Sequence, residues 1–160
     1  MSKIAQALGA NYEQKRKEIF IRKFELNGYS FQVRIPMVSE SDAMYQRIAN
    51  PDEKEVEKIY QQIIEPLIQF KETAGEEITF TENDVLIGDR SMREAAKNKA
   101  LVQQRVVEYI KLLVPVVEGA SFDDLTYDEV EAEWPMSVQL ALCEKIGEAI
   151  SPGYKETRGN

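Results

Sequence analysis

The chain has 160 residues, no histidine, a single cysteine and a formal net charge of −8 at pH 7. The lack of histidine excludes Ser-His-Asp and Cys-His catalysis and histidine zinc sites, and one cysteine allows neither a thiolate zinc site nor an internal disulfide. The negative charge disfavours nucleic-acid binding, and no apolar run reaches the roughly 20 residues that span a bilayer. We therefore expect one soluble, cytosolic domain over 1–160 that binds neither nucleic acid nor membrane.

The clearest local signal is a β-hairpin over 17–36 with Asn-Gly at 27–28. Asn-Gly between apolar-rich runs is typical of a type I′ turn, because both central residues need a positive φ. This turn pairs Phe24 with Phe31 and gives the hairpin one apolar face, on which Arg22 is the only polar member. The apolar members are Phe20, Phe24, Leu26, Tyr29, Phe31, Val33 and Ile35. Two strands with one apolar face are marginal in water, so that face must be covered. The chain's own helices are the favoured cover, and strands of a neighbouring copy are the alternative.

Before the hairpin, residues 2–17 form either a short helix or a loose arm. After it, residues 39–150 are predicted to be mainly helical. Capping-box patterns at Ser39, Ser91 and Thr126 mark helix starts, and the Asn50-Pro51 and Trp134-Pro135 pairs separate helices. The expected fold is therefore α+β, mostly α, with an N-terminal hairpin followed by four or five helices. Residues 151–160 are expected to be a frayed tail.

Apolar residues at helical spacing predict three buried faces. The helix over 51–72 carries Val56, Ile59, Tyr60, Ile63, Ile64, Leu67 and Phe70. The helix over 91–113 carries Ala95, Val102, Val106, Tyr109, Ile110 and Leu113. The last helix carries Val138, Leu142, Ile146, Ala149 and Ile150. Pro66 should kink or end the first of these helices near Glu65. Residues 73–90 are predicted to be loop, with a second small hairpin over 78–87 as the alternative.

No motif points to catalysis or to a cofactor. The glycines form neither GxGxxG nor a phosphate-binding loop, and no Ser-x-x-Lys is present. Asp123-Asp124 and Asp128-Glu129 do not follow the EF-hand pattern of alternating oxygen ligands around a glycine. We therefore predict a protein that is not an enzyme and that has no catalytic, cofactor-binding or metal-binding residues.

Charge is distributed unevenly along the chain. Residues 1–36 hold seven Lys/Arg and three acids, a net of +4, whereas residues 116–160 hold three bases and ten acids, a net of −7. Within the latter, Glu118–Glu133 contains seven carboxylates and no base. These ends are expected either to pair, within one molecule or in a salt-dependent homo-oligomer, or to remain solvated.

Five residues are candidates for partner binding: Phe24, Tyr29, Phe31, Val33 and Trp134. The first four belong to the apolar face of the hairpin, where a partner would replace the chain's own helices. Trp134 is the only tryptophan, and it stands between an acidic helix and a proline. We favour Trp134 as a core residue that sets the angle between two helices, and the alternative is an exposed interface residue.

The hairpin FELNGYSFQVRIP, the AMYQRI helix and the EVEAEWP segment before a final amphipathic helix resemble the small tail assembly chaperones of long-tailed, siphovirus-like bacteriophages. The resemblance is most specific over Phe24–Pro36 with AMYQRI, and over Tyr127–Ile150. It implies a non-enzymatic protein of the infected host's cytoplasm that binds the tape measure protein and keeps it soluble. It also implies that the protein helps recruit tail tube subunits and is absent from the mature virion. Many such proteins are also made in a longer, frameshifted form.

Two other functions remain open on the sequence alone. One is a structural or adaptor subunit of the phage particle, such as a head–tail or tail-completion protein, which would stay in the virion. The other is a small acidic inhibitor that imitates nucleic acid through Glu118–Glu133.

Overall fold

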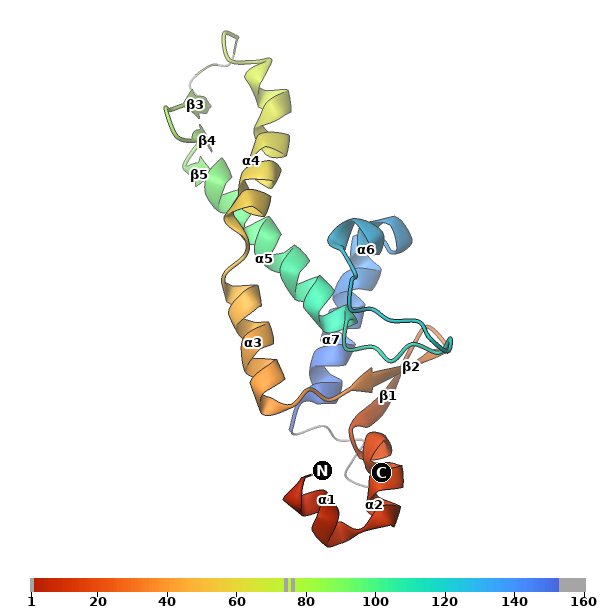
Figure 1. Cartoon of the computed structure of the whole chain (residues 1–160). Coiled ribbons are helices and arrows are strands. Elements are labelled where there is room, and N and C mark those ends of the chain that lie inside the picture. Colours follow the sequence, from red (N-terminus) through yellow and green to blue (C-terminus); the bar gives the residue numbers. More distant parts are fainter. Residues whose placement is uncertain (1, 74, 76, 153–160) are drawn as a thin grey trace. The chain divides into compact units, whose positions relative to one another are not determined.

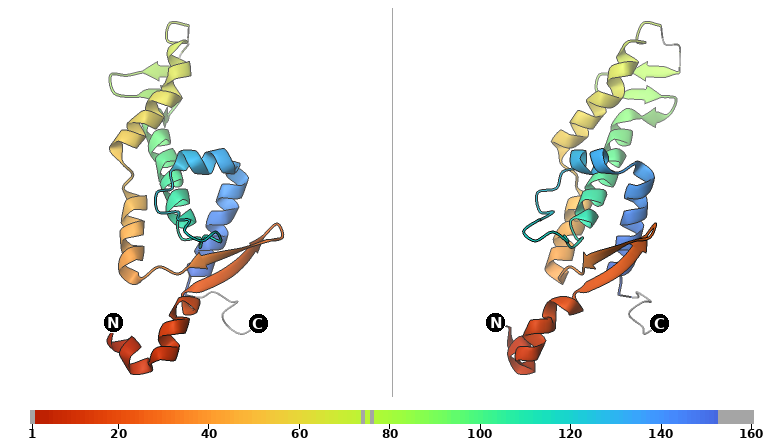
Figure 2. Two further views of the ribbon diagram at one scale, coloured as in Figure 1. Left: turned by 45° about the vertical axis from the view of Figure 1, so that its right-hand side comes forward. Right: turned by 90° about the vertical axis from the view of Figure 1, so that its right-hand side faces the viewer.

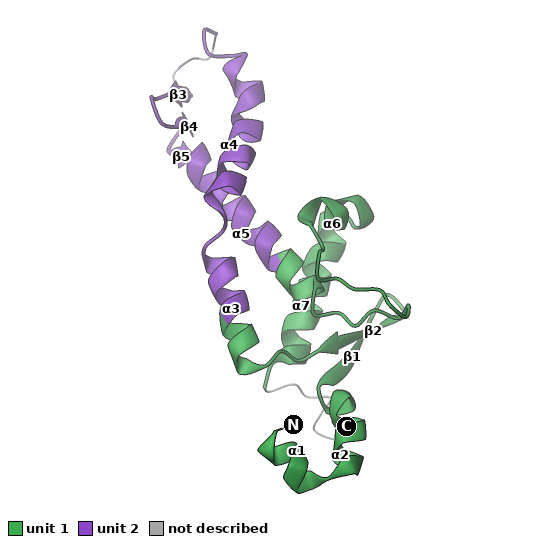
Figure 3. Ribbon diagram, in the orientation of Figure 1, with its two compact units in different colours: residues 1–42, 106–160 green, residues 43–105 purple. Residues whose placement is uncertain are grey.

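The computed structural model describes residues 2–73, 75 and 77–152 (Figure 1). It confirms the predicted α+β class, with an N-terminal hairpin and, among the described residues, five helices after it. Where the sequence predicts one domain, these residues form two compact units (Figure 3). Unit 1 comprises residues 1–42 and 106–160, and unit 2 comprises residues 43–105. Most of the predicted frayed tail, from residue 153 on, lies outside the described residues.

The hairpin in unit 1 has the predicted register. β1 (Ile21–Leu26) pairs antiparallel with β2 (Tyr29–Arg34), and Phe24 stands opposite Phe31. The φ angles are 52° at residue 27 and 86° at residue 28, the positive values that a type I′ turn requires. The hairpin is shorter than the predicted 17–36, because residues 17–19 continue the preceding helix.

Residues 112–114 pair with the outer edge of β2. The Arg34 N–H donates to the Leu112 carbonyl and the Val114 N–H donates to the Gln32 carbonyl, each at 2.8 Å. Leu113 forms an antiparallel bridge with a β2 residue. The predicted end of the long helix near Leu113 is therefore wrong: α5 (Met92–Ile110) stops three residues earlier. Residues 112–114 of the same chain therefore occupy this edge of β2. The alternative, that strands of a neighbouring copy pair with the hairpin, does not apply to this stretch.

The last helix, α7 (Met136–Ile150), packs against both strands of the hairpin, as Figure 2 shows in two views. Phe24 is 7% exposed and Val33 is 0% exposed, so the chain's own structure covers this part of the apolar face, as the sequence favours. Arg22 has a structural role on that face. Its guanidinium donates to the Ala149 carbonyl and, at 2.9 Å, to the Ser151 carbonyl, which satisfies acceptors at the C-terminal end of α7.

The other helix starts of unit 1 follow local capping rules. α6 (Tyr127–Glu133) opens with the predicted capping box, in which Thr126 and Glu129 bond to each other's backbone N–H groups. The N-terminal segment is helical rather than a loose arm, and forms α1 (Lys3–Leu8) and α2 (Ala10–Ile19). α3 (Val38–Ala49) begins one residue before the predicted cap at Ser39. In its first turn Glu40 accepts a bidentate bond from Arg34, with N–O distances of 2.6 and 2.7 Å.

Unit 2 packs helix against a small sheet. α4 (Glu53–Ile68) is capped by Asp52 and continues through Pro66, ending two residues after it. The favoured loop prediction for 73–90 is wrong, and the alternative of a small hairpin over 78–87 is confirmed. β3 (Ile78–Phe80), β4 (Val85–Ile87) and β5 (Arg90–Ser91) form an antiparallel sheet in the order β3-β4-β5. These strands are held because Val85 is buried in the hydrophobic core against α4.

The core of unit 2 corrects two predicted helix faces. Its buried members are Ile59, Tyr60, Ile64, Val85, Met92, Ala96 and Ala100. Phe70, predicted on the buried face of the helix over 51–72, lies beyond the end of α4 and is 52% exposed. Val102, predicted on the buried face of α5, is 41% exposed. Ala96 and Ala100, one helical turn apart, are buried members of this core on α5. Among the described residues, each helix is too short or too polar to cross a membrane.

Two glycine substitutions should move stability in opposite directions. Gly28→Ala places a Cβ at a positive φ and should lower the free energy of unfolding by about 1–2 kcal/mol.

Gly147→Ala lies inside α7, where the new Cβ would stand 3.5 Å from Tyr109 Cε2, an ordinary van der Waals contact. It should raise stability by about 0.5–1 kcal/mol. Urea unfolding measures the free energy of unfolding of both variants. A Gly28→Ala protein as stable as the wild type would contradict the assigned turn.

Candidate functional site: an apolar groove beside the hairpin

A groove with a volume of about 660 Å³ lies in unit 1, between β2, residues 113–122 and the corner before α7. Its apolar wall includes Tyr29, Phe31, Leu113, Pro115, Phe122 and Trp134. This volume is within the usual range for protein binding pockets. Three of the five predicted partner-binding residues therefore lie together in one concave surface.

Aromatic side chains connect the core of unit 1 to this groove. The ring of Phe31 stacks on Phe24, with centroids 5.3 Å apart, and meets Tyr29 edge-on at 4.8 Å. Exposure rises along this series from 7% at Phe24 to 57% at Tyr29. Phe24 and Val33 were predicted to contact a partner, but both are buried. Phe24 supports the wall of the groove through its stack on Phe31, and neither Phe24 nor Val33 lines the groove.

The opposite wall is formed by the segment that begins at Pro115, directly after the strand-like pairing at 112–114. The pairing bonds end at Val114, and the chain bends away from β2 at residues 116 and 117. Val116 and Val117 then line the groove and are 85% and 73% exposed. The turn closes with a bond from the Ala120 N–H to the Val117 carbonyl at 3.1 Å. Sequence reasoning missed these two valines, although an apolar pair between a proline and an acidic run was a usable signal.

Trp134 is held at the corner between α6 and α7. Its carbonyl accepts a bond from the buried Gln139 amide at 2.9 Å, and the Gln139 side-chain oxygen accepts from the Tyr127 hydroxyl at 2.9 Å. Burial raises the pKa of Tyr127, which keeps the phenol protonated as a donor. Trp134 itself is half-buried and lines the groove, so it is neither the buried core residue that the sequence favours nor fully exposed, and its role in an interface stays a prediction.

Three acidic residues are direct chain neighbours of lining residues, and we refer to them as the rim of the groove. Glu118 follows the lining residue Val117, Asp123 follows Phe122, and Glu133 precedes Trp134, and all three acids are exposed. Within the described residues, no three or more metal-ligating side chains come together. An apolar groove with an acidic rim is suited to holding another molecule.

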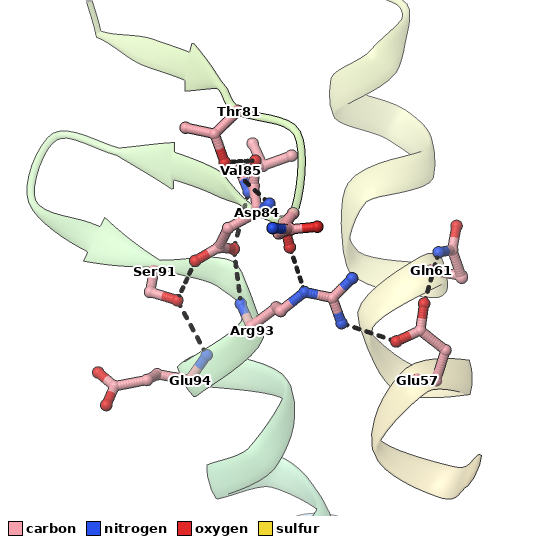
Figure 4. Close-up of polar contacts among 9 residues, drawn as sticks. Glu57, Gln61, Thr81, Asp84, Val85, Ser91, Arg93 and Glu94 are labelled. Carbon is pink, nitrogen blue, oxygen red and sulfur yellow. Dashed lines mark hydrogen bonds and ion pairs between the residues drawn. The ribbon is translucent and has the colours of Figure 1, made fainter. Parts of the chain in front are cut away.

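Unit 2 contains a polar cluster centred on Asp84 (Figure 4). Its carboxylate accepts from the N–H groups of Val85 and Arg93, at 2.7 and 3.1 Å, and from the Ser91 hydroxyl. Its backbone also bonds to Thr81 at 2.9 Å. Ser91 shows half of its predicted capping box, since its hydroxyl accepts the N–H of residue 94 at 3.1 Å. The cluster thus joins the β3–β4 turn to the start of α5.

Arg93 extends this cluster to α4. Its guanidinium pairs with Glu57 at 2.7 Å, bonds to the Asn83 carbonyl and lies 3.9 Å from the centre of the Tyr60 ring. Gln61 donates to the other oxygen of Glu57 at 3.0 Å. The charged groups are bonded to one another, so the cluster serves to fix the sheet on the helices. A hollow of about 470 Å³ beside it is lined partly by this same Arg93–Glu57 pair.

No protein-family model, curated protein or solved structure gives a significant match to this chain. The function is therefore inferred from the residues of the groove and from the two stretches of sequence that carry the resemblance.

Asp84 makes the stability of unit 2 dependent on pH. Burial raises the pKa of this carboxyl, but the bonds from Ser91, Arg93 and Val85 outweigh burial and hold the pKa below its ordinary value. The ionised form therefore stabilises the fold above the ordinary carboxyl pKa of about 4, and this contribution is lost as pH falls through the lowered folded-state pKa.

Asp84→Asn should lower the free energy of unfolding by about 1 kcal/mol at pH 7, because the amide cannot accept all three bonds. The difference from the wild type should shrink towards pH 3. Thermal unfolding between pH 7 and 3 measures both effects. The control is Asp89→Asn, an exposed aspartate in the next turn, which should change little. An equal gap at pH 7 and pH 3 would contradict the assigned role of the carboxylate.

Proposed function

We propose that this chain is a non-enzymatic tail assembly chaperone of a long-tailed bacteriophage. In this proposal it binds the tape measure protein in the host cytoplasm, keeps it soluble and helps recruit tail tube subunits. It then leaves before the virion is complete. The observation that carries the proposal is the apolar groove beside the hairpin, which exposes Tyr29, Val116 and Val117.

The position of the groove fits the resemblance in the sequence. The stretch Phe24–Pro36 contributes Tyr29 and Phe31, and the stretch Tyr127–Ile150 contributes Trp134. The two segments that most resemble the tail assembly chaperones thus meet in the same surface. A shared binding surface is one reason for two distant segments to carry such a pattern.

The groove suits the task of keeping an apolar chain in solution. A long tape measure protein exposes apolar helical faces before the tail tube surrounds it, and exposed apolar faces associate unless they are masked. A partner that binds such faces lowers the free concentration of the exposed form by mass action. Amphipathic helices commonly dock their apolar face into a groove of this kind.

A structural or adaptor subunit of the particle is the alternative function. Such a subunit would also need an apolar surface for its neighbours, but it would remain in purified virions. Protein detection in virions therefore separates the alternatives, since the chaperone proposal requires the chain to be abundant in infected cells and absent from particles.

Co-expression with the tape measure protein tests the proposal. The wild-type chain should raise the soluble fraction of that protein several-fold. Val117→Asp should abolish most of this gain, because a carboxylate in the groove would have to be desolvated on binding. Val117 is 73% exposed in the free protein, so the substitution should not unfold the chain.

Val38→Asp is the matched control. Val38 is 79% exposed and does not line the groove, and an acid in the first turn of α3 suits the helix dipole. This variant should solubilise the partner as well as the wild type does. If the wild type gives no gain, the chaperone proposal is wrong; if both variants lose the gain equally, the groove is not the binding surface.

A further inference from the structure

Acidic residues flank several lining residues of the apolar groove along the chain. Glu118, Asp123 and Glu133 are direct chain neighbours of lining residues, so their Cα atoms lie about 3.8 Å from those of the groove wall. Asp124 comes next in the chain. Across the hairpin, Glu25 stands opposite the lining residue Ser30, on the same face of the sheet. All five carboxylates belong to exposed residues of unit 1.

Positive charge near the groove is limited. Lys23 is the basic residue in its lining. Arg34 lies on β2, where it pairs with Glu40 through two bonds of 2.6 and 2.7 Å and also interacts electrostatically with Asp123. The run from 118 to 133, which supplies most of the rim, contains no lysine or arginine. Acids that neighbour the lining along the chain therefore outnumber the basic residue in the lining, and most of the wall is apolar.

We infer that the groove selects apolar segments that carry lysine or arginine beside their apolar face. This inference rests on the proposed function and adds the chemistry of the partner to it. The apolar wall covers the partner's aliphatic or aromatic side chains, and the rim carboxylates attract flanking cations. A segment flanked by acids is repelled by the same rim.

The size of the expected preference depends on the exposure of the rim. Ion pairs between exposed rim carboxylates and cations of the partner act across water and are screened over about 8 Å at physiological ionic strength. Each such pair therefore contributes little to the binding free energy. Several carboxylates acting together should favour a basic over a neutral segment by roughly tenfold at low salt. The preference should fall towards unity at about 1 M salt, where the screening length is about 3 Å.

Trp134 provides a direct readout, because it is the only tryptophan of the chain and lines the groove. The probes are three synthetic peptides of about four helical turns without tryptophan, identical on their apolar face and flanked by lysine, glutamine or glutamate. Each is titrated into the full chain while the emission of Trp134 is followed at low and high salt. We expect affinity to fall in the order lysine, glutamine, glutamate, and the three affinities to converge at high salt.

A triple variant tests whether the rim causes the preference. Glu118→Gln, Asp124→Asn and Glu133→Gln together should reduce the lysine-over-glutamine ratio from about tenfold to about twofold, without weakening the glutamine peptide. The control neutralises three exposed acids of unit 2 that have no groove residue as a chain neighbour: Glu55→Gln, Glu65→Gln and Glu72→Gln. It changes net charge equally and should keep the tenfold ratio.

The outcomes separate this inference from the proposed function. Equal binding of the three peptides, or loss of the preference in the control as well, would overturn charge selection by the rim and leave the chaperone proposal standing. Failure of all three peptides to change Trp134 emission or to bind would overturn the inference and also remove the groove from the proposed function.

Discussion

The apolar face of the hairpin must be covered, and the way the chain covers it determines the rest of unit 1. α7 packs across the strands, while residues 112–114 occupy the outer edge of β2. Burying Val33 alone should contribute about 1.5–3 kcal/mol. Arg22, the polar residue on this face, binds carbonyls at the end of α7. The hairpin and the last helix therefore depend on each other, although they lie at opposite ends of the sequence.

This cover is incomplete, and the uncovered part is the candidate binding surface. Phe24 is buried under the chain's own structure, whereas Tyr29, at the turn end of the same face, is more than half exposed. The edge pairing ends at Val114, and Val116 and Val117 line the open part. An apolar surface left open beside carboxylates stays hydrated in the free protein and gains from burial when a partner arrives.

Features that depend on a few adjacent residues were predicted correctly from the sequence. Features that depend on contacts between distant segments were not. Asn27-Gly28 sets the hairpin register through its own backbone angles, and the Thr126 capping box needs only four residues. The pairing of 112–114 with β2 joins residues about eighty positions apart, so helical spacing up to Leu113 was misleading. The β3–β5 sheet depends on bonds from Asp84 to the start of α5, which no propensity reveals. The groove was found only in part, because three separate segments build it.

Amide hydrogen exchange on the chain, alone and with the tape measure protein, tests the central claim most directly. The amides of Arg34 and Val114 should exchange slowly in both states, because they bond within the chain. Amides over 116–119, and that of Ser30, should slow only when the partner is present. Rapid exchange at Arg34 and Val114 in the free protein, or protection by the partner confined to residues outside the groove, would contradict the account.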